Sequence, residues 1–212
     1  RFILKTAAVI AGVGAMAPIG GWAQTTLRRT PDQILGPFYP ITDKHKPERA
    51  EDLIHVPGGN GRAKGQLLNV SGRVLTTAGE PVPRARIEIW QANAAGRYAH
   101  PDDTNPAPLD PNFLGYTVLM SGADGGYRFE TIKPGAYPTG PNTIRPSHIH
   151  FDVSGAHDRL VTQMYFDSDP YNEKDRFLQS VLRPEALIVK LQPTGGTEAE
   201  PLLAIFDIVI RG

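Results

Sequence analysis

Apolar and polar residues alternate along most of the chain after residue 66, in short runs separated by glycine, proline and aspartate. Leu68, Val70 and Val74 share one parity, which is typical of a strand with one buried face. Only residues 172–182 show helical spacing, and Pro184 would end that helix. The remaining pattern predicts about eight short strands, over residues 68–74, 85–90, 116–120, 127–132, 144–153, 160–166, 186–191 and 202–210.

This arrangement of elements predicts a single all-β domain. Repeated helix-length patterns, which other fold classes need, do not occur between these strands. An antiparallel β-sandwich with long loops and one short helix is the most economical way to bury one face of each strand. We assign residues 67–212 to this domain and residues 24–66 to an extended N-terminal arm.

The first 23 residues have the pattern of an export signal. A basic start at Arg1–Lys5 precedes the apolar or small residues 7–19, and the small residue Ala23 precedes a polar one. The apolar run is too short to span a bilayer. Because residues 1–5 resemble the second half of a twin-arginine signal, we expect export to the periplasm or beyond, and no membrane segment in the mature protein. The alternative is an N-terminal helix that docks on the domain.

The composition excludes several kinds of partner and binding site. The 22 basic residues balance the 22 acidic ones, which argues against nucleic acid as a partner. The chain has no cysteine, which excludes disulfides, thiolate metal sites and cysteine nucleophiles. Eight of its 20 prolines fall within residues 98–146. We expect them to stiffen the loops of that segment.

Residues 145–153 carry the most informative chemistry. If this segment is a strand, His148 and His150 project from one face while Ile149 and Phe151 enter the core. Two imidazoles placed in this way can bind one metal ion. A polar pair on a solvated strand face explains the same spacing. The other four histidines (His45, His55, His100 and His157) lie in loops and are expected to be solvated.

The residue types that would complete such a site decide the metal. Asp152 shares the parity of the two histidines and would give a ferrous site with two histidines and one carboxylate. Tyr98 and Tyr137 lie in loops next to glycine and proline, where a constrained backbone could place them at a metal. Phenolate donors would favour ferric iron. Packed tyrosines with tethered hydroxyls are the alternative.

Several longer motifs occur in a fixed order along the chain. They are Gly36-Pro37-Phe38-Tyr39 and residues 90–98 (WQANAAGRY), 107–113 (APLDPNF), 131–135 (TIKPG), 145–151 (RPSHIHF) and 162–166 (TQMYF). Together they resemble the intradiol ring-cleavage dioxygenases, most closely the β subunit of protocatechuate 3,4-dioxygenases. That resemblance implies a sandwich of the transthyretin (prealbumin) type.

The resemblance also implies the site and its reaction. Asp152 has no metal role in the family pattern, so we drop it as a ligand. Arg145 matches the active-site arginine and Tyr137 a ligand that also acts as a base. The reaction uses O2 to split a catechol-type diol between its hydroxylated carbons, giving a cis,cis-muconate that contains both oxygen atoms. One Fe(III) per site would be bound by Tyr98, Tyr137, His148 and His150.

Substrate identity stays open at this stage. Tyr39, Trp90 and Gln163 match residues that line the substrate pocket. In protocatechuate enzymes the ligand matching Tyr137 is commonly followed by Pro-Trp, whereas Thr139 stands here, which should change the pocket wall. Protocatechuate, catechol, hydroxyquinol and plant-derived catechols are all candidates. We also expect a homo-oligomer. The alternative function is a non-catalytic transthyretin-like binding module, which would not need all four ligands.

Overall fold

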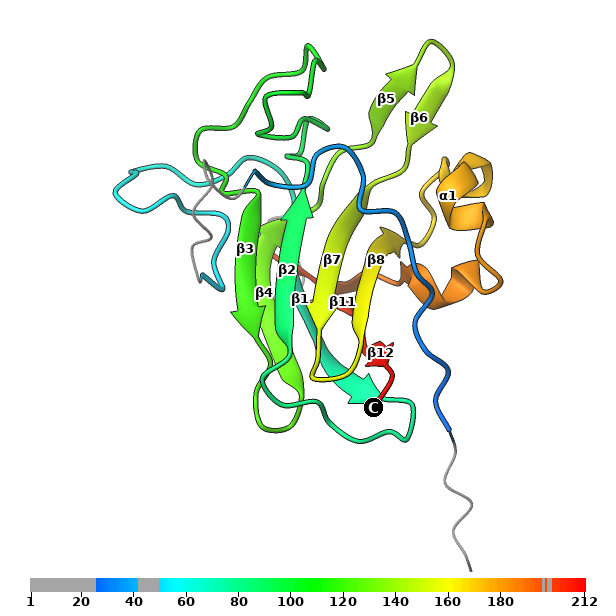
Figure 1. The fold of residues 1–212 in the computed structure, drawn as a ribbon. Coiled ribbons are helices and arrows are strands. Elements are labelled where there is room, and N and C mark those ends of the chain that lie inside the picture. The colour runs from blue at the N-terminus through cyan, green and yellow to red at the C-terminus, as the bar shows by residue number, and fades with distance from the viewer. Residues whose placement is uncertain (1–25, 42–49, 196, 198–199) are drawn as a thin grey trace, which may run out of the picture.

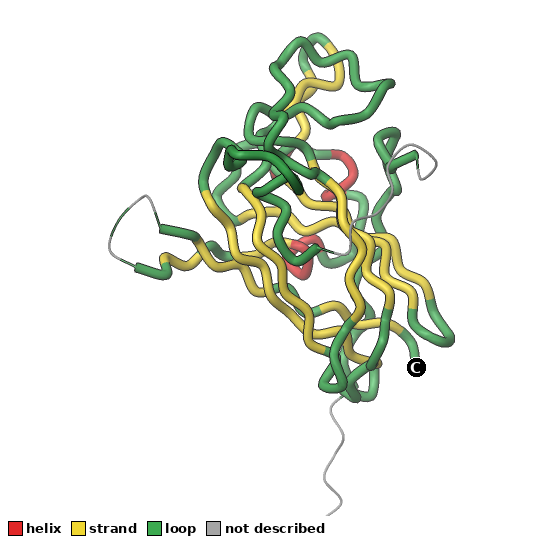
Figure 2. The backbone as a smooth tube through the Cα atoms, turned by 90° about the vertical axis from the view of Figure 1, so that its left-hand side faces the viewer, coloured by secondary structure: helices red, strands yellow, loops and turns green. Residues whose placement is uncertain are grey.

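The computed structural model describes residues 26–41, 50–195, 197 and 200–212, so the predicted export signal lies outside the described residues. Two five-stranded sheets pack against each other, and a two-stranded hairpin stands at one end (Figure 1). The predicted β-sandwich is confirmed. Short turns lie at one end of the sandwich, whereas the long loops gather with the hairpin at the other end (Figure 2).

The first sheet is built around β1 (Leu67–Thr76). β1 pairs with β4 (Gly126–Ile132) in antiparallel fashion and with β11 (Leu202–Ile205) and β12 (Ile208–Ile210) in parallel fashion, while β10 (Gln192–Pro193) flanks β11. The strand predicted over residues 202–210 is therefore two strands. Phe206 and Asp207 separate them and bond to β1 instead: the Phe206 amide donates to the Ser71 carbonyl, and Asp207 accepts from the Arg73 amide.

The second sheet has the order β3-β2-β7-β8-β9. All of its pairs are antiparallel except that of β8 with β9. Together with the two parallel pairs of β1 in the first sheet, this gives three parallel pairs in a sandwich that was predicted to be antiparallel. The strands are β2 (Arg86–Gln91), β3 (Tyr116–Met120), β7 (His148–Ser154), β8 (Arg159–Phe166) and β9 (Ile188–Val189).

The strand predicted over residues 144–153 is interrupted at Pro146-Ser147. Proline has no amide hydrogen for a sheet ladder, so the chain leaves one pairing there and enters another. Residues before the break form β6 (Thr143–Arg145), which pairs with β5 (Tyr137–Gly140) as a hairpin. Residues after it form β7. Pro146 thus separates the strand that carries Arg145 from the strand that carries the two histidines.

The helix predicted over residues 172–182 is shorter than expected. It consists of a 3-10 turn, η1 (Asn172–Lys174), and one α-helical turn, α1 (Arg176–Gln179), with a second 3-10 turn, η2 (Pro184–Leu187), farther on. Asp175 is extended (φ −75°, ψ 110°) and ends the first turn. Its carboxylate then caps α1 by accepting hydrogen bonds from the Phe177 and Leu178 amides. No helix in the described part of the chain is long and apolar enough to cross a membrane.

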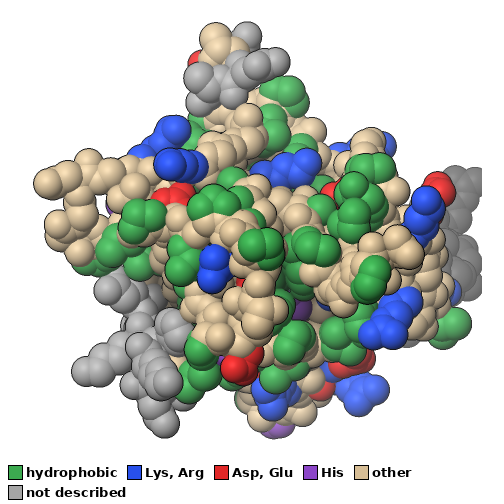
Figure 3. All heavy atoms as spheres, turned by 90° about the horizontal axis from the view of Figure 1, so that it is seen from above, with side chains coloured by type: hydrophobic (Ala, Val, Ile, Leu, Met, Phe, Trp, Pro, Cys, Tyr) green, Lys and Arg blue, Asp and Glu red, His purple; other side chains and the backbone are tan. Residues whose placement is uncertain are grey.

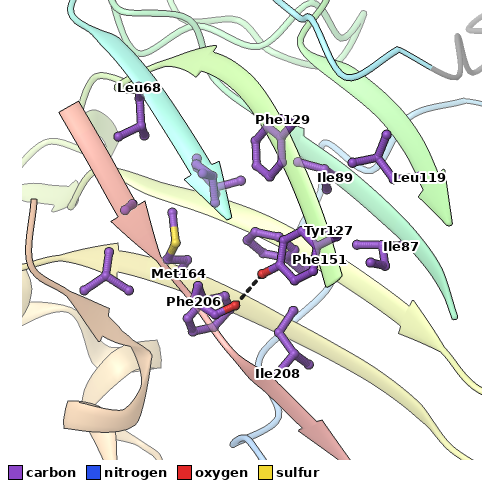
Figure 4. Packing of buried hydrophobic residues seen from close by; sticks show 14 of the residues in the cluster. Leu68, Ile87, Ile89, Leu119, Tyr127, Phe129, Phe151, Met164, Phe206 and Ile208 are labelled. Carbon is purple, nitrogen blue, oxygen red and sulfur yellow. Dashed lines mark hydrogen bonds between the residues drawn. The ribbon is translucent and has the colours of Figure 1, made fainter. Parts of the chain in front are cut away.

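The core lies between the two sheets. Ile87, Ile89 and Phe151 of the second sheet face Leu68 and Phe129 of the first, and all five are buried (Figure 4). The alternation of β2 and β7 explains this directly, because every second residue enters the core. The opposite face of the same strands is left free to carry polar chemistry.

One close approach in the first sheet gives a stability prediction. A Cβ atom on Gly72 would stand 1.9 Å from the Phe206 carbonyl oxygen, which also accepts a 2.5 Å hydrogen bond from the Tyr127 hydroxyl. We expect Gly72→Ala to destabilise the fold by about 1–3 kcal/mol, measured by urea unfolding. Gly140→Ala is the control, because its Cβ would meet only Thr143 Oγ1, at 4.0 Å. Equal losses in both variants would contradict this account.

Residues 26–41 of the predicted arm run along the sandwich without regular secondary structure, whereas residues 50–66 form turns and bury Leu53 and Ile54 in the core. The Leu27, Thr30 and Gln33 amides donate to the carbonyls of Thr77, Val209 and Val161. The segment then passes across the second sheet toward the loop end (Figure 1). It thereby brings Phe38 onto the rings of Tyr98 and Tyr137, with centroids 4.8 Å and 6.2 Å away.

Candidate metal centre

Four buried side chains from three segments meet at the loop end of the second sheet. Each is at most 6% exposed, and they are the four ligands that the family resemblance implies: Tyr98, Tyr137, His148 and His150. The Nε2 atoms of His148 and His150 lie 3.1 Å apart, and the Tyr98 hydroxyl lies 3.5 Å from His148 Nε2. The ring of Tyr137 lies 5.5 Å from that of Tyr98 and 5.6 Å from that of His148, between centroids.

The hydrogen bonds of His148 fix its tautomer. Its Nδ1 lies 2.7 Å from the Pro146 carbonyl oxygen, which can only accept, so Nδ1 carries the proton. The Nε2 atom, directed at His150, therefore has a free lone pair in the neutral ring. The turn at Pro146 thus orients the first imidazole for binding a cation.

Burial keeps both histidines neutral. It lowers the pKa of His148 well below the usual value, and the charge of Arg145 adds to this effect. The pKa of His150 is likewise lowered well below its usual value by burial, by His148 and by Arg145. His150 Nδ1 has no hydrogen-bond partner among the described residues. Two neutral imidazoles that present Nε2 atoms to each other in a buried site are suited to sharing a cation.

The two tyrosine loops are held together through their glycines. Gly96 has φ +79°, and a Cβ atom on it would stand 2.4 Å from the Ala136 carbonyl oxygen. Only glycine satisfies both the backbone angle and this contact. The Tyr98 amide donates to Asp103 Oδ2 at 2.7 Å, which fixes the first tyrosine from the other side. The loop sequences therefore place both phenols against β7.

The phenols are hard to ionise without a cation. Burial raises the pKa of Tyr98 well above its usual value, and Tyr137, to which it donates a hydrogen bond, raises it further. Burial also raises the pKa of Tyr137, although the nearby Arg145 guanidinium opposes this shift. A bound trivalent cation would reverse that balance and favour both phenolates.

Arg145 is held by three side chains and stacks on a fourth. Its Nε donates to Asp175 Oδ2 at 2.6 Å, and its Nη2 donates to Gln163 Oε1 at 2.8 Å and to the Tyr165 hydroxyl at 3.0 Å. The guanidinium also lies over the Phe177 ring, 4.6 Å from its centroid. Arg145 and Asp175 form a buried ion pair, with 5% and 1% of their side chains exposed. The fixed guanidinium faces Tyr137.

Sequence reasoning missed two of the partners of Arg145, Asp175 and Tyr165. Asp175 is recognisable in sequence as an acidic residue at a helix start, and it does cap α1. Its other carboxylate oxygen, however, reaches back across 30 residues to Arg145. Tyr165 looks like an ordinary strand aromatic. No local pattern in the sequence could join these three residues.

The three residues predicted to line the substrate pocket lie behind the cluster. Trp90 stacks on His150, with ring centroids 4.7 Å apart and planes at 12°. Tyr39 contacts Trp90 edge to face and donates to Glu88 Oε2 at 2.9 Å. Gln163 is fully buried and bonds to Arg145. Trp90 thus orients the His150 ring, and Gln163 orients the Arg145 guanidinium. Contact of these residues with a substrate stays a prediction.

Two other expectations can be compared with the structure. Asp152 is buried on the face of His150, but its carboxylate binds Arg159 at 2.6 Å, so it is already occupied. Within the described ranges no three histidine, cysteine or acidic side chains are grouped to hold a metal, which disfavours the ferrous alternative.

The expectation that His100 is solvated is wrong, because it packs on Phe38 with 6% of its side chain exposed.

A cavity of about 860 Å³ opens beside the cluster. Tyr137 and Arg145 form part of its wall, together with the β5–β6 hairpin, the residues around α1 and part of the arm. Figure 3 views the molecule from this end, where hydrophobic and basic side chains are interspersed. A ligand in this cavity would meet the guanidinium and one phenol directly.

Comparisons with known proteins identify the family of this chain. Residues 34–212 match the family model described as dioxygenase (Dioxygenase_C). The chain is 50% identical over 169 residues to the protocatechuate 3,4-dioxygenase β chain of Burkholderia cepacia, covering 76% of this chain and 71% of that protein. It is 33% identical to hydroxyquinol 1,2-dioxygenase of a Rhizobium species, over 67% of this chain and 49% of that protein.

Solved structures give the same picture. Catechol 1,2-dioxygenase of Acinetobacter sp. ADP1 superposes with a TM-score of 0.66 at 27% identity, covering 87% of this chain and 64% of that one. The dioxygenase domain of a carbohydrate-binding fusion protein from Streptomyces sp. SirexAA-E gives 0.66 at 26% identity, covering 87% and 99%. The chain spans about half the length of the curated hydroxyquinol and catechol dioxygenases that it matches. By its sequence along most of its length and by its fold, the chain belongs to the intradiol ring-cleavage dioxygenase family.

Proposed function

We propose that this chain is a non-haem Fe(III) dioxygenase that cleaves a catechol-type diol between its hydroxylated carbons with O2, giving a cis,cis-muconate. One observation carries the proposal: two phenol oxygens and two neutral imidazole nitrogens converge in a buried site beside a fixed guanidinium. Membership of the intradiol family supports it.

The donor set fits ferric iron. Tyr98, Tyr137, His148 and His150 would hold the ion, and hard phenolate oxygens favour the trivalent state. The lone pair fixed on His148 Nε2 suits a ring that binds a cation through Nε2, and His150 Nε2 lies 3.1 Å from it. The bound ion would supply Lewis acidity toward the diol and the redox chemistry toward O2.

Tyr137 is placed to act as a base. It is the one phenol of the four-residue cluster that lines the cavity, so it stands next to a diol that enters there. We assign to Tyr137 Oη the acceptance of one diol proton. Arg145 beside it lowers the energy of the ionised phenol, in accord with its opposing effect on the pKa of Tyr137.

Arg145 is a stabiliser of negative charge. Its ion pair with Asp175 and its bonds to Gln163 and Tyr165 fix the guanidinium before substrate arrives. A fixed cation in a buried site stabilises charge that develops on the aromatic ring in the transition state without reorganising. Phe38 packs on the Tyr98 ring from the arm side of the site, with centroids 4.8 Å apart.

We also propose partners, a location and an oligomeric state for the chain. The partners are a small aromatic diol and O2, as the names of its relatives suggest. The N-terminal pattern supports export to the periplasm or beyond, through a twin-arginine signal. Self-association into a homo-oligomer is in keeping with the similarity to a β chain.

Iron content and colour provide the test. We expect the purified protein to bind about one iron per chain and to show a visible charge-transfer band from tyrosinate to Fe(III). His148→Ala should lose both the iron and the band, whereas His157→Ala, at a loop position between β7 and β8, should keep them. A colourless protein that takes up no iron and cleaves no diol after iron loading would favour the non-catalytic binding module instead.

A further inference from the structure

We propose that the cavity beside Tyr137 is specific for catechols that carry a bulky, uncharged substituent. This inference rests on the proposed function and adds the substrate class. The diol would lie at Tyr137 and Arg145, and the substituent would extend between the β5–β6 hairpin and α1.

The size of the cavity is the first argument. Its volume of about 860 Å³ falls near the top of the range for sites that take drug-sized ligands, about 300–1,000 Å³. A single catechol ring would fill only a small part of this space. The remaining volume would hold water when an unsubstituted catechol is bound, and the substituent of a larger catechol would displace that water.

The wall of the cavity is the second argument. Ile34 and Ile144 are each 38% exposed, and these two exposed isoleucines both line this cavity. Exposed apolar side chains that gather around a hollow mark a binding surface for apolar groups. The other apolar residues of the wall continue the same surface, namely Pro37, Phe38, Pro138 and Phe177.

The charges around the cavity indicate an uncharged substituent. Three basic and three acidic residues line it, so no net charge selects an ion: Arg145, Lys174 and Arg176 against Asp102, Asp103 and Asp175. Most of these groups already have partners. Asp175 binds Arg145, Asp103 accepts from the Tyr98 amide, and the guanidinium of Arg176 lies 4.6 Å from the centroid of the Phe177 ring.

Small residues on the hairpin leave the space open. Thr139, Gly140 and Thr143 form the β5–β6 side of the wall, and all three are exposed. Thr139 comes two residues after Tyr137 on β5, and both residues line this cavity. A large side chain at position 139 would therefore occupy the volume assigned to the substituent.

The test compares oxygen uptake with catechol, 4-methylcatechol, 4-tert-butylcatechol, 4-phenylcatechol and protocatechuate. Burial of apolar carbon favours binding by about tenfold for every two methylene groups, so we expect kcat/KM for the tert-butyl and phenyl compounds to exceed that for catechol by about tenfold or more. Protocatechuate, which carries a charged carboxylate, should show no such gain.

Variants locate the effect. Thr139→Trp and Ile144→Ser should each lower the ratio of kcat/KM for 4-phenylcatechol to that for catechol by about fivefold or more. Ile205→Ser, which alters an exposed isoleucine on β11 outside the cavity lining, should leave the ratio unchanged. Cleavage of catechol with no preference for larger substrates, or a preference that Thr139→Trp leaves intact, would overturn this inference alone. Failure to cleave any diol would instead overturn the proposed function.

Discussion

Replacing Tyr137 by phenylalanine is expected to lower kcat for catechol cleavage by about 10²–10⁴-fold, the usual contribution of a positioned acid–base group. The variant keeps the ring that packs between Tyr98 and His148 but lacks the phenolic oxygen of this cavity-lining residue. It therefore cannot accept the diol proton. Loss of one phenolate donor should also shift the visible absorption band of the iron-loaded protein, which gives a readout independent of turnover.

Tyr171→Phe is the matched control for that variant. Tyr171 precedes η1, and its backbone amide donates a hydrogen bond to Asp169 Oδ1. This bond does not involve the phenol that the substitution changes. Both the rate and the spectrum of the control should equal those of the wild-type protein. If Tyr137→Phe cleaves catechol as fast as the wild type with a full complement of iron, the role of Tyr137 as a base is wrong.

Arg145→Ala is expected to have the second large effect, on both stability and activity. The substitution leaves the carboxylate of Asp175 buried without its cation, and breaking a buried ion pair in this way costs about 3–5 kcal/mol. Loss of the guanidinium should also lower kcat by about 10²–10³-fold. Urea unfolding and oxygen uptake measure the two effects separately.

A double variant separates stability from catalysis. Arg145→Ala combined with Asp175→Asn removes the unpaired charge, while asparagine keeps a side-chain oxygen that can cap α1. We expect the double variant to recover much of the lost stability and none of the lost activity. Recovery of activity together with stability would mean that Arg145 acts only through the fold. Arg128→Ala, which alters an exposed arginine paired with the exposed Glu51, is the control for removing an arginine.

Alternation along the chain was sufficient to predict the central strands. The pattern over residues 116–120 matches β3 residue for residue, and the runs around Ile87 and Phe151 match core positions of β2 and β7. Strand boundaries were predicted wrongly where one continuous apolar run forms two strands that pair at different places. The apolar run from Leu202 to Ile210 looks continuous, but its two halves pair with different parts of β1. The hairpin of β5 and β6 has too little alternation to be seen.

The candidate site was only partly accessible from the residues themselves. The spacing of His148 and His150 indicated a shared face, but spacing alone also admitted Asp152, which the structure pairs with Arg159. The loop settings of Tyr98 and Tyr137 made them candidates, but only the family resemblance assigned both as ligands, because the contact between their loops depends on a fold in which Gly96 meets Ala136. Asp175 could not be found at all, since its cap role hides its bond to Arg145.

The most direct test of the central claim is the fate of dioxygen. Iron-loaded protein would be incubated briefly with catechol under ¹⁸O2, and the product identified by mass spectrometry. We predict cis,cis-muconate with both labelled atoms incorporated, formed with uptake of one O2 for each catechol consumed. An unlabelled quinone, a ring-opened semialdehyde from cleavage beside the diol, or no labelled product would contradict the assignment of this chain as an intradiol dioxygenase.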